Sequence, residues 1–334
     1  MTTVEEATGA TRRRTFEPRR VVSRHGWTVG VYILLVVLFI LYIAAAPIAF
    51  TSFDLNSIVM GALPLVFAAM AQAVIVISGG IDLSIGVMVA VINVTAAKYM
   101  EGEAFGTALL IAVGLMVLGV IIGTINGGLI VASGVPDIVV TLAMSFVWGG
   151  VALLILRTPG GGAPEDFLQL GTGTVFSLWI PAGLVVIALV LAAVWLPIRW
   201  RRPGFAIYAI GSNRERAYLS GVSVNRTRVL AYSLGGFFAA MGGLAATATT
   251  GIGTPYAGNF ITLNSVAAVV LGGVSLIGGK GGMVGPIAAA ICLTLVPQIM
   301  VFQGIDPNYG QVIQGALIVV VVMLGGLLVL RGRA

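Results

Sequence analysis

The stretch that decides the fold runs from residue 56 to residue 97 and reads NSIVMGALPLVFAAMAQAVIVIS-GGIDLS-IGVMVAVINVTAA. Residues 56–78 and 83–97 carry no charge, and Asp82 stands between these two apolar runs. A helix of about 20 apolar residues can cross the hydrocarbon core of a bilayer. Because removing an ionised carboxylate from water is costly, Asp82 marks either a function or the boundary between two membrane spans.

The composition of the whole chain is that of a membrane protein. Of its 334 residues, 58% are hydrophobic and 9% are charged, whereas a soluble domain carries about 25% charged residues. The single cysteine, Cys292, lies in an apolar run and is expected to serve packing. The predicted fold class is therefore all-α, a polytopic bundle of transmembrane helices.

Apolar runs of sufficient length predict about ten spans. Glycine-rich breaks separate the second span from the third and the eighth from the ninth. The predicted spans are 28–49, 56–78, 84–100, 106–132, 137–156, 175–197, 228–249, 261–277, 283–301 and 311–330.

The positive charges predict the orientation. Sixteen of the eighteen Lys and Arg residues fall in or at the edge of segments that an even span count places on one side, and only Lys98 and Arg157 fall elsewhere. Cytoplasmic segments carry such an excess, so both ends are predicted to be cytoplasmic. This confinement to membrane edges argues against nucleic-acid binding. The predicted parts are a basic N-terminal segment, 1–27, a transmembrane domain, 28–330, with a cytoplasmic loop, 198–227, and a tail, 331–334.

The outer segment 157–174 is rich in Pro and Gly, which predicts an irregular loop. It is either a solvated connector or a surface that meets an external partner.

The break around Asp82 has three interpretations. Its carboxylate could cap the helix that starts near Ser84, line a polar path, or form one half of a structural ion pair. The neighbouring glycines free the backbone to bend. The break residues singled out are Gly79, Gly80, Asp82, Leu83 and Ser84.

Few polar side chains fall inside the predicted spans. They could hydrogen-bond neighbouring helices, or they could line a path for a neutral hydroxylated solute, which needs donors and acceptors more than charges. The candidates for the path are Gln72, Asn93, Asn126, Thr141 and Asn264.

No catalytic residue, metal site or cofactor site is predicted. The turn Gly278–Gly282 resembles a phosphate loop, but Gly281 follows Lys280 where such a loop needs Ser or Thr. His25 has no second potential metal ligand nearby in the sequence and is expected at the membrane interface.

The loop 198–227 contains a short predicted helix that opens with a cap at Ser212 or Asn213 and ends at Gly221. Such a helix could lie on the bilayer surface, with its arginines on lipid headgroups, or dock a cytoplasmic partner. The residues singled out are Asn213, Arg214, Glu215, Arg216, Ala217, Ser220 and Gly221.

Several ordered blocks between residues 55 and 328 together resemble the sugar-type permease family of ATP-binding-cassette (ABC) importers, which includes the ribose, xylose and galactose permeases. Two departures stand out, since the family often has Phe where this chain has Asp137, and paired alanines where it has Glu215-Arg216. The blocks are GGIDLSIG at 79–86, Asn126-Gly127, Val135-Pro136, IVVTL at 138–142, Gly211-Ser212-Asn213, Ala217, Ser220-Gly221-Val222, AAVVLGGVSL at 267–276, and the glycine pairs 278–279 and 281–282.

The resemblance implies a ten-helix permease of the vitamin-B12-importer type in the bacterial plasma (inner) membrane. It implies a second permease subunit, a cytoplasmic ATPase that binds Mg-ATP, and a periplasmic or lipid-anchored sugar-binding protein. The short helix 213–221 would be the coupling helix that contacts the ATPase. The expected cargo is a monosaccharide or related polyol.

Alternative cargoes for the same architecture are branched-chain amino acids, nucleosides or a signalling furanose. An ion-coupled secondary transporter usually needs ionisable groups at mid-membrane, which this chain essentially lacks, and a non-transport membrane scaffold is the remaining alternative.

Overall fold

The computed structural model describes residues 18–46, 49–306 and scattered positions from 309 to 323. Residues 1–17, the side chain of His25 and the predicted tail 331–334 lie outside this part of the chain, as does most of the predicted tenth span, 311–330.

Helices are the regular elements of the described residues. Two isolated bridges pair Gly160 with Gly253 and Thr174 with Pro181. The helices are α1 (Pro18–Ala45), α2 (Ser52–Ile77), α3 (Ile85–Met100), α4 (Phe105–Ser133), α5 (Asp137–Ile155), α6 (Glu165–Thr172), α7 (Ala182–Val190), the π-helical turn η1 (Leu191–Trp195), α8 (Leu196–Arg199), α9 (Arg202–Ser212), α10 (Arg214–Leu219), α11 (Val224–Thr250), α12 (Ile261–Leu271) and α13 (Val284–Phe302).

The described residues contain seven helices that are long and apolar enough to cross a membrane, counting α7, η1 and α8 as one. There are also two shorter apolar helices. Helix α3 follows the glycine-rich break after α2, and α12 precedes the one before α13. Each of the first nine predicted spans contains one of these helices, so the all-helical class is confirmed.

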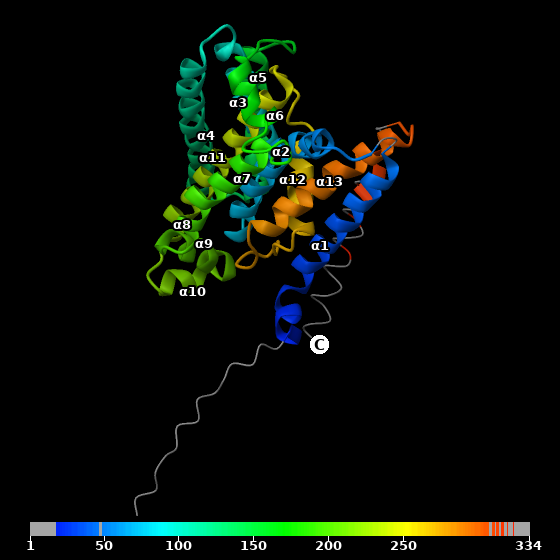
Figure 1. The fold of residues 1–334 in the computed structure, drawn as a ribbon. Helices are drawn as coiled ribbons and strands as arrows, with labels where there is room; N and C mark the ends of the chain where they lie inside the picture. Colours follow the sequence, from blue (N-terminus) through cyan, green and yellow to red (C-terminus); the bar gives the residue numbers. More distant parts are fainter. Residues whose placement is uncertain are drawn as a thin grey trace, which may run out of the picture.

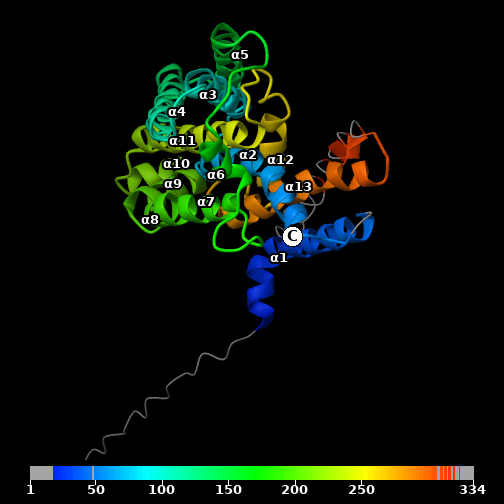
Figure 2. The same ribbon diagram turned by 45° about the horizontal axis from the view of Figure 1, so that its top comes forward.

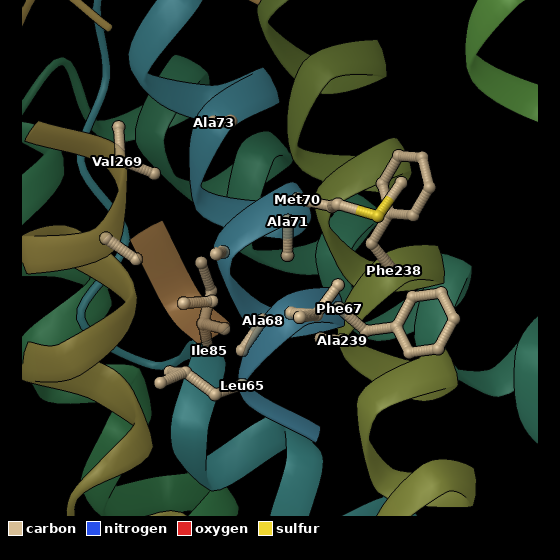
Figure 3. Packing of buried hydrophobic residues seen from close by; sticks show 14 of the residues in the cluster. Leu65, Phe67, Ala68, Met70, Ala71, Ala73, Ile85, Phe238, Ala239 and Val269 are labelled. Carbon is tan, nitrogen blue, oxygen red and sulfur yellow. The ribbon is translucent and has the colours of Figure 1, made fainter. Parts of the chain in front are cut away.

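Helix α2 is the centre of the bundle, because its sequence is apolar on every face. In its most apolar window 83% of the residues are buried, against 11% in α1 and in α5. Phe67 and Met70 of α2 pack against Phe238 of α11, and Val269 of α12 lies on another side of α2 (Figure 3). The outer helices α1 and α5 leave broad apolar faces exposed.

Helices α4 and α11 approach closely through small residues. A Cβ atom added at Gly119 would strike Ala240, and one added at Gly127 would lie 2.9 Å from the Cβ of Tyr232. Gly119, Gly123 and Gly127, which recur at four-residue spacing in α4, therefore serve helix packing.

The structure differs from the prediction in the segment 157–174 and at the start of the sixth span. The Pro- and Gly-rich segment 157–174 was expected to lack regular helix, but α6 forms there, because Pro164 stands at its N-cap and Glu165 and Asp166 occupy its first turn. The sixth span begins at Ala182 and not at 175, since Val175 and Ile180 close a hairpin through a 2.9 Å backbone bond.

The predicted eighth span also ends early, at Leu271, because Gly272 and Gly273 follow and Gly273 adopts a φ of 80°.

Helices α9 and α10 lie together at one end of the bundle (Figures 1 and 2). The α2–α3 break, residues 78–84, and the α12–α13 break, residues 272–283, contact this α9–α10 end. We call them the first break and the second break.

Candidate functional site

The first break is built around a buried carboxylate. Asp82 is 1% exposed, and its Oδ1 accepts hydrogen bonds from the backbone N–H of Ser84, at 2.7 Å, and from the Ser84 hydroxyl, at 2.6 Å. Helix α3 starts at the next residue, Ile85. Both bonds end at the residue before the helix, and no side-chain cap bond reaches the N–H groups of its first turn. The carboxylate therefore orders the turn that leads into α3, and capping of the helix itself stays a hypothesis.

Side chains from α4 and α5 extend this network. Asn126 donates to the Ser84 hydroxyl at 2.8 Å and accepts from the Trp148 indole N–H at 3.1 Å. The Thr141 hydroxyl oxygen accepts from the backbone N–H of Leu83 at 3.1 Å. Two of the residues proposed for a solute path therefore hold the first break in place.

The other path candidates lie apart from this network. Asn93 ties α3 to α11 and to the loop after it, through Thr247 at 2.9 Å and the backbone N–H of Thr254 at 2.8 Å. Gln72 is fully buried, and neither atom of its amide finds a hydrogen-bond partner among the described residues. Asn264 is half-buried in α12.

An ion pair stands beside the first break. Arg228 Nη2 lies 2.6 Å from Asp137 Oδ1, and the Tyr232 hydroxyl donates to Asp137 Oδ2 at 2.8 Å. The ion pair in this region therefore uses Asp137 and not Asp82. From the sequence, Asp137 stands out only as a departure from a family pattern. A signal for the pair was present, because Asp137 and Arg228 each stand at the start of an apolar run.

Helices α9 and α10 contact both breaks through glycines. A Cβ atom on Gly211 would overlap the Ile77 carbonyl oxygen and lie 2.6 Å from the Gly279 backbone nitrogen. The Gly279 N–H donates to the carbonyl of Ile77, the last residue of α2, at 2.9 Å. A Cβ atom on Gly278 would lie 2.9 Å from the Gly79 Cα, so the two breaks also touch each other. Only glycine fits at Gly211 without moving the backbone.

The short helix α10 is capped as predicted, at the second of the two proposed positions. The Asn213 side chain accepts from the Arg216 backbone N–H at 2.8 Å, while Ser212 ends α9. The Arg214 guanidinium donates to the Gly79 carbonyl at 3.1 Å. Helix α10 is thus bonded directly to the first break.

The remaining members of the predicted coupling set surround this link. Ala217 is buried, and Glu215, Arg216, Ser220 and Gly221 are exposed.

A cavity of about 450 Å³ opens at this junction. Gly79, Asp137, Arg214 and Arg228 are among its lining residues, so it lies between the first break, α5, α10 and α11. Within the described ranges no three His, Cys, Asp or Glu side chains gather in a way that could hold a metal ion. The arrangement joins the short polar helix α10 to the first break and to the apolar helices α5 and α11.

The comparisons with known proteins assign the chain to a family. The family model described as the permease component of branched-chain amino acid transport systems matches residues 55–322. No solved structure matches the chain.

Three curated relatives align over most of their length. The ribose import permease protein of Escherichia coli (strain K12) is 29% identical over 87% of this chain and 91% of its own. The autoinducer 2 import system permease protein of Enterobacter sp. (strain 638) is 31% identical over 89% and 92%. A probable ABC transporter permease protein of Escherichia coli (strain K12) is 31% identical over 94% and 93%.

These matches, with the seven apolar helices, indicate a multi-pass protein of the bacterial inner membrane. The junction of α10 with the two breaks lies within the matched residues. The chain therefore belongs to the permease-component family of ABC importers that the branched-chain amino acid transport model describes.

Proposed function

We propose that this permease moves a monosaccharide or related polyol into the cell, driven by ATP hydrolysis on a separate chain. The observation that carries the proposal is the link between α10 and the first break, the hydrogen bond from Arg214 to the Gly79 carbonyl. A soluble helix bonded to the backbone between two membrane helices is suited to pass on movement of a partner. ATP binding would then shift the population between open states of the path.

The proposed architecture has ten spans of the vitamin-B12-importer type, with both ends cytoplasmic. The placement of Lys and Arg supports this orientation. The α9–α10 end would then face the cytoplasm, and the segment 157–181 would face the periplasm. The transmembrane domain would run over 28–330, between the basic segment 1–27 and the tail 331–334.

Helix α10 and its flanks are the proposed docking element for the cytoplasmic ATPase, which would bind Mg-ATP. Its exposed residues Glu215, Arg216 and Ser220 lie on the surface, while Arg214 turns back to Gly79. The proposed importer also contains a second permease subunit, which is identical or different. A periplasmic or lipid-anchored sugar-binding protein would deliver the solute, and membrane lipid would surround the permease subunits.

Among the path candidates, Gln72 has the strongest claim to face a solute, because its buried amide lacks a partner among the described residues. Asn93, Asn126 and Thr141 already bond within the fold, which favours a structural role for them.

The relatives' names support the cargo, since they include a ribose and a fructose import permease. The autoinducer 2 import permease among them favours the alternative of a signalling furanose. The family description favours branched-chain amino acids as the second candidate. The binding protein encoded beside this permease should bind a monosaccharide in calorimetric titration. Binding of leucine or valine, with no response to sugars, would favour the second candidate.

The docking proposal is tested by co-purification of the ATPase with the permease from detergent-solubilised membranes. Arg216→Glu should abolish the association while the permease stays folded. The matched control is Arg157→Glu, an exposed arginine at the opposite end of the bundle. Normal retention of the ATPase by Arg216→Glu would contradict the docking role of α10.

A further inference from the structure

Asp137 is held on both carboxylate oxygens by α11. Oδ1 pairs with Arg228 at 2.6 Å, and Oδ2 accepts from the Tyr232 hydroxyl at 2.8 Å. The side chains of Arg228 and Asp137 are 13% and 12% exposed, and Tyr232 is 1% exposed. The three side chains form one largely buried cluster at the N-terminal ends of α5 and α11.

This cluster encloses the backbone of the first break. A Cβ atom added at Gly80 would lie 2.6 Å from Asp137 Oδ2 and 2.8 Å from the Tyr232 hydroxyl. The Tyr232 hydroxyl also lies 3.4 Å from the Ile81 carbonyl oxygen. Because Gly80 has no side chain, the Asp137 carboxylate and the Tyr232 hydroxyl can lie against its backbone. A side chain at position 80 would push the cluster away from the first break.

The other side of the same short segment is bonded to α10, through Arg214 and the Gly79 carbonyl at 3.1 Å. Adjacent residues of the first break thus connect to α10 and to the cluster. Helix α5 otherwise packs chiefly on α3 and α4, so the cluster is its direct link to α11.

A buried ion pair is weak evidence for stability, because the loss of hydration can exceed the attraction. Its better-attested use is to fix one arrangement among several. Here Arg228 Nε is buried without a partner among the described residues, and the junction cavity lies beside both charges. These features indicate that the Asp137–Arg228 pair fixes the relative position of α5 and α11 more than it stabilises the fold.

We propose that Asp137, Arg228 and Tyr232 are positioning residues that clamp Gly80–Ile81 to α5 and α11. Displacement of α10, carried to Gly79 by Arg214, then moves α5 and α11 together with the first break. The inference rests on the proposed coupling to an ATPase. It assigns a role in energy coupling to a cluster outside the predicted coupling set.

The test uses the full permease with its ATPase and binding protein in proteoliposomes, loaded with the sugar that the binding protein takes. The measured quantity is the amount of solute transported per ATP hydrolysed. Asp137→Asn and Arg228→Gln should each lower this ratio about tenfold, since each removes a charge-assisted bond, while ATPase retention stays normal. The matched control is Arg226→Gln, an exposed arginine on the same helix, which should leave the ratio unchanged.

A single substitution leaves one buried charge unpaired and could unfold the protein. The double variant Asp137→Asn with Arg228→Gln removes both charges, and Tyr232→Phe keeps the ion pair but removes the hydroxyl near Ile81. Both should fold and show a lowered ratio. Folded double and Tyr232→Phe variants with the wild-type ratio would overturn the inference. Failure of the wild-type permease to retain the ATPase would instead overturn the proposed function.

Discussion

The two glycine-rich breaks lie against each other, yet they are closed by different means. The first break, residues 78–84, is held by side chains, with Asp82, Asn126 and Thr141 bonding to it from inside the bundle. The second break, residues 272–283, is held mostly by its own backbone. Its Ser275 N–H donates to the Lys280 carbonyl at 3.1 Å, and four of its glycines have positive φ angles, Gly273, Gly278, Gly279 and Gly281.

The difference between the two breaks indicates where a displacement of α10 would be passed to the membrane helices. Side-chain bonds from α4, α5, α10 and α11 connect the first break to many helices, so a displacement there spreads. The second break is bonded to α9 through the Tyr208 hydroxyl, which donates to the Gly281 carbonyl at 2.8 Å, and its turns depend on positive φ angles that other residues rarely adopt. We therefore expect it to respond to changes in its own glycines more than to changes in neighbouring helices. The following predictions test that contrast, from the largest effect to the smallest.

Gly211→Ala should affect both breaks, because a Cβ there overlaps the Ile77 carbonyl and crowds Gly279. We expect a loss of about 3 kcal/mol in stability from this overpacking, measured by thermal unfolding in detergent. Gly128→Ala, where nothing lies within 4 Å of the added atom, is the control and should not destabilise. Equal melting of the two variants would contradict the close contact.

Asn126→Ala should loosen the first break alone. It leaves the Trp148 indole N–H without its partner and removes the donor to the Ser84 hydroxyl, which keeps its own bond to Asp82. The expected cost is roughly 2 kcal/mol. Hydrogen exchange should accelerate in peptides covering 78–84 and stay unchanged over 272–283. The exposed Asn225→Ala serves as control, and equal acceleration in both breaks would refute independent closure.

Gly281→Ala should loosen the second break alone, since Gly281 has a φ of 125° that an alanine adopts only under strain. The expected loss is about 1.5 kcal/mol. Gly282→Ala is the adjacent control, with open space around the added atom. If Gly281→Ala and Gly282→Ala lower the free energy of unfolding equally, the positive φ of Gly281 does not determine this turn.

Asp82→Asn should have the smallest effect, because the amide keeps an oxygen that can accept from Ser84. We expect roughly 0.5–1 kcal/mol of lost local stability and largely intact solute uptake. Complete loss of uptake with normal expression would instead assign Asp82 to the path.

Local sequence signals predicted much of this fold and part of the site. Apolar run length predicted about ten spans, of which nine overlap helices of the described residues. The Asn213 cap and both breaks follow from residues close in sequence. The Asp137–Arg228 pair was missed because its partners are 91 residues apart and only the fold brings them together. Helix α6 was missed because the Pro and Gly content of 157–174 was taken to exclude regular helix. Its last proline, Pro164, precedes the first turn, where a missing N–H breaks no helical bond.

Transfer of movement from α10 to the first break through Arg214 is tested most directly by the solute transported per ATP hydrolysed, in proteoliposomes with the ATPase and binding protein. The two variants are Arg214→Gln and Arg226→Gln. Both substitutions remove one exposed arginine charge from neighbouring helices, and Arg214 bonds to Gly79. The ratio should be about tenfold lower for Arg214→Gln and unchanged for Arg226→Gln among complexes that retain the ATPase. Equal ratios for the two variants would show that Arg214 does not carry the movement.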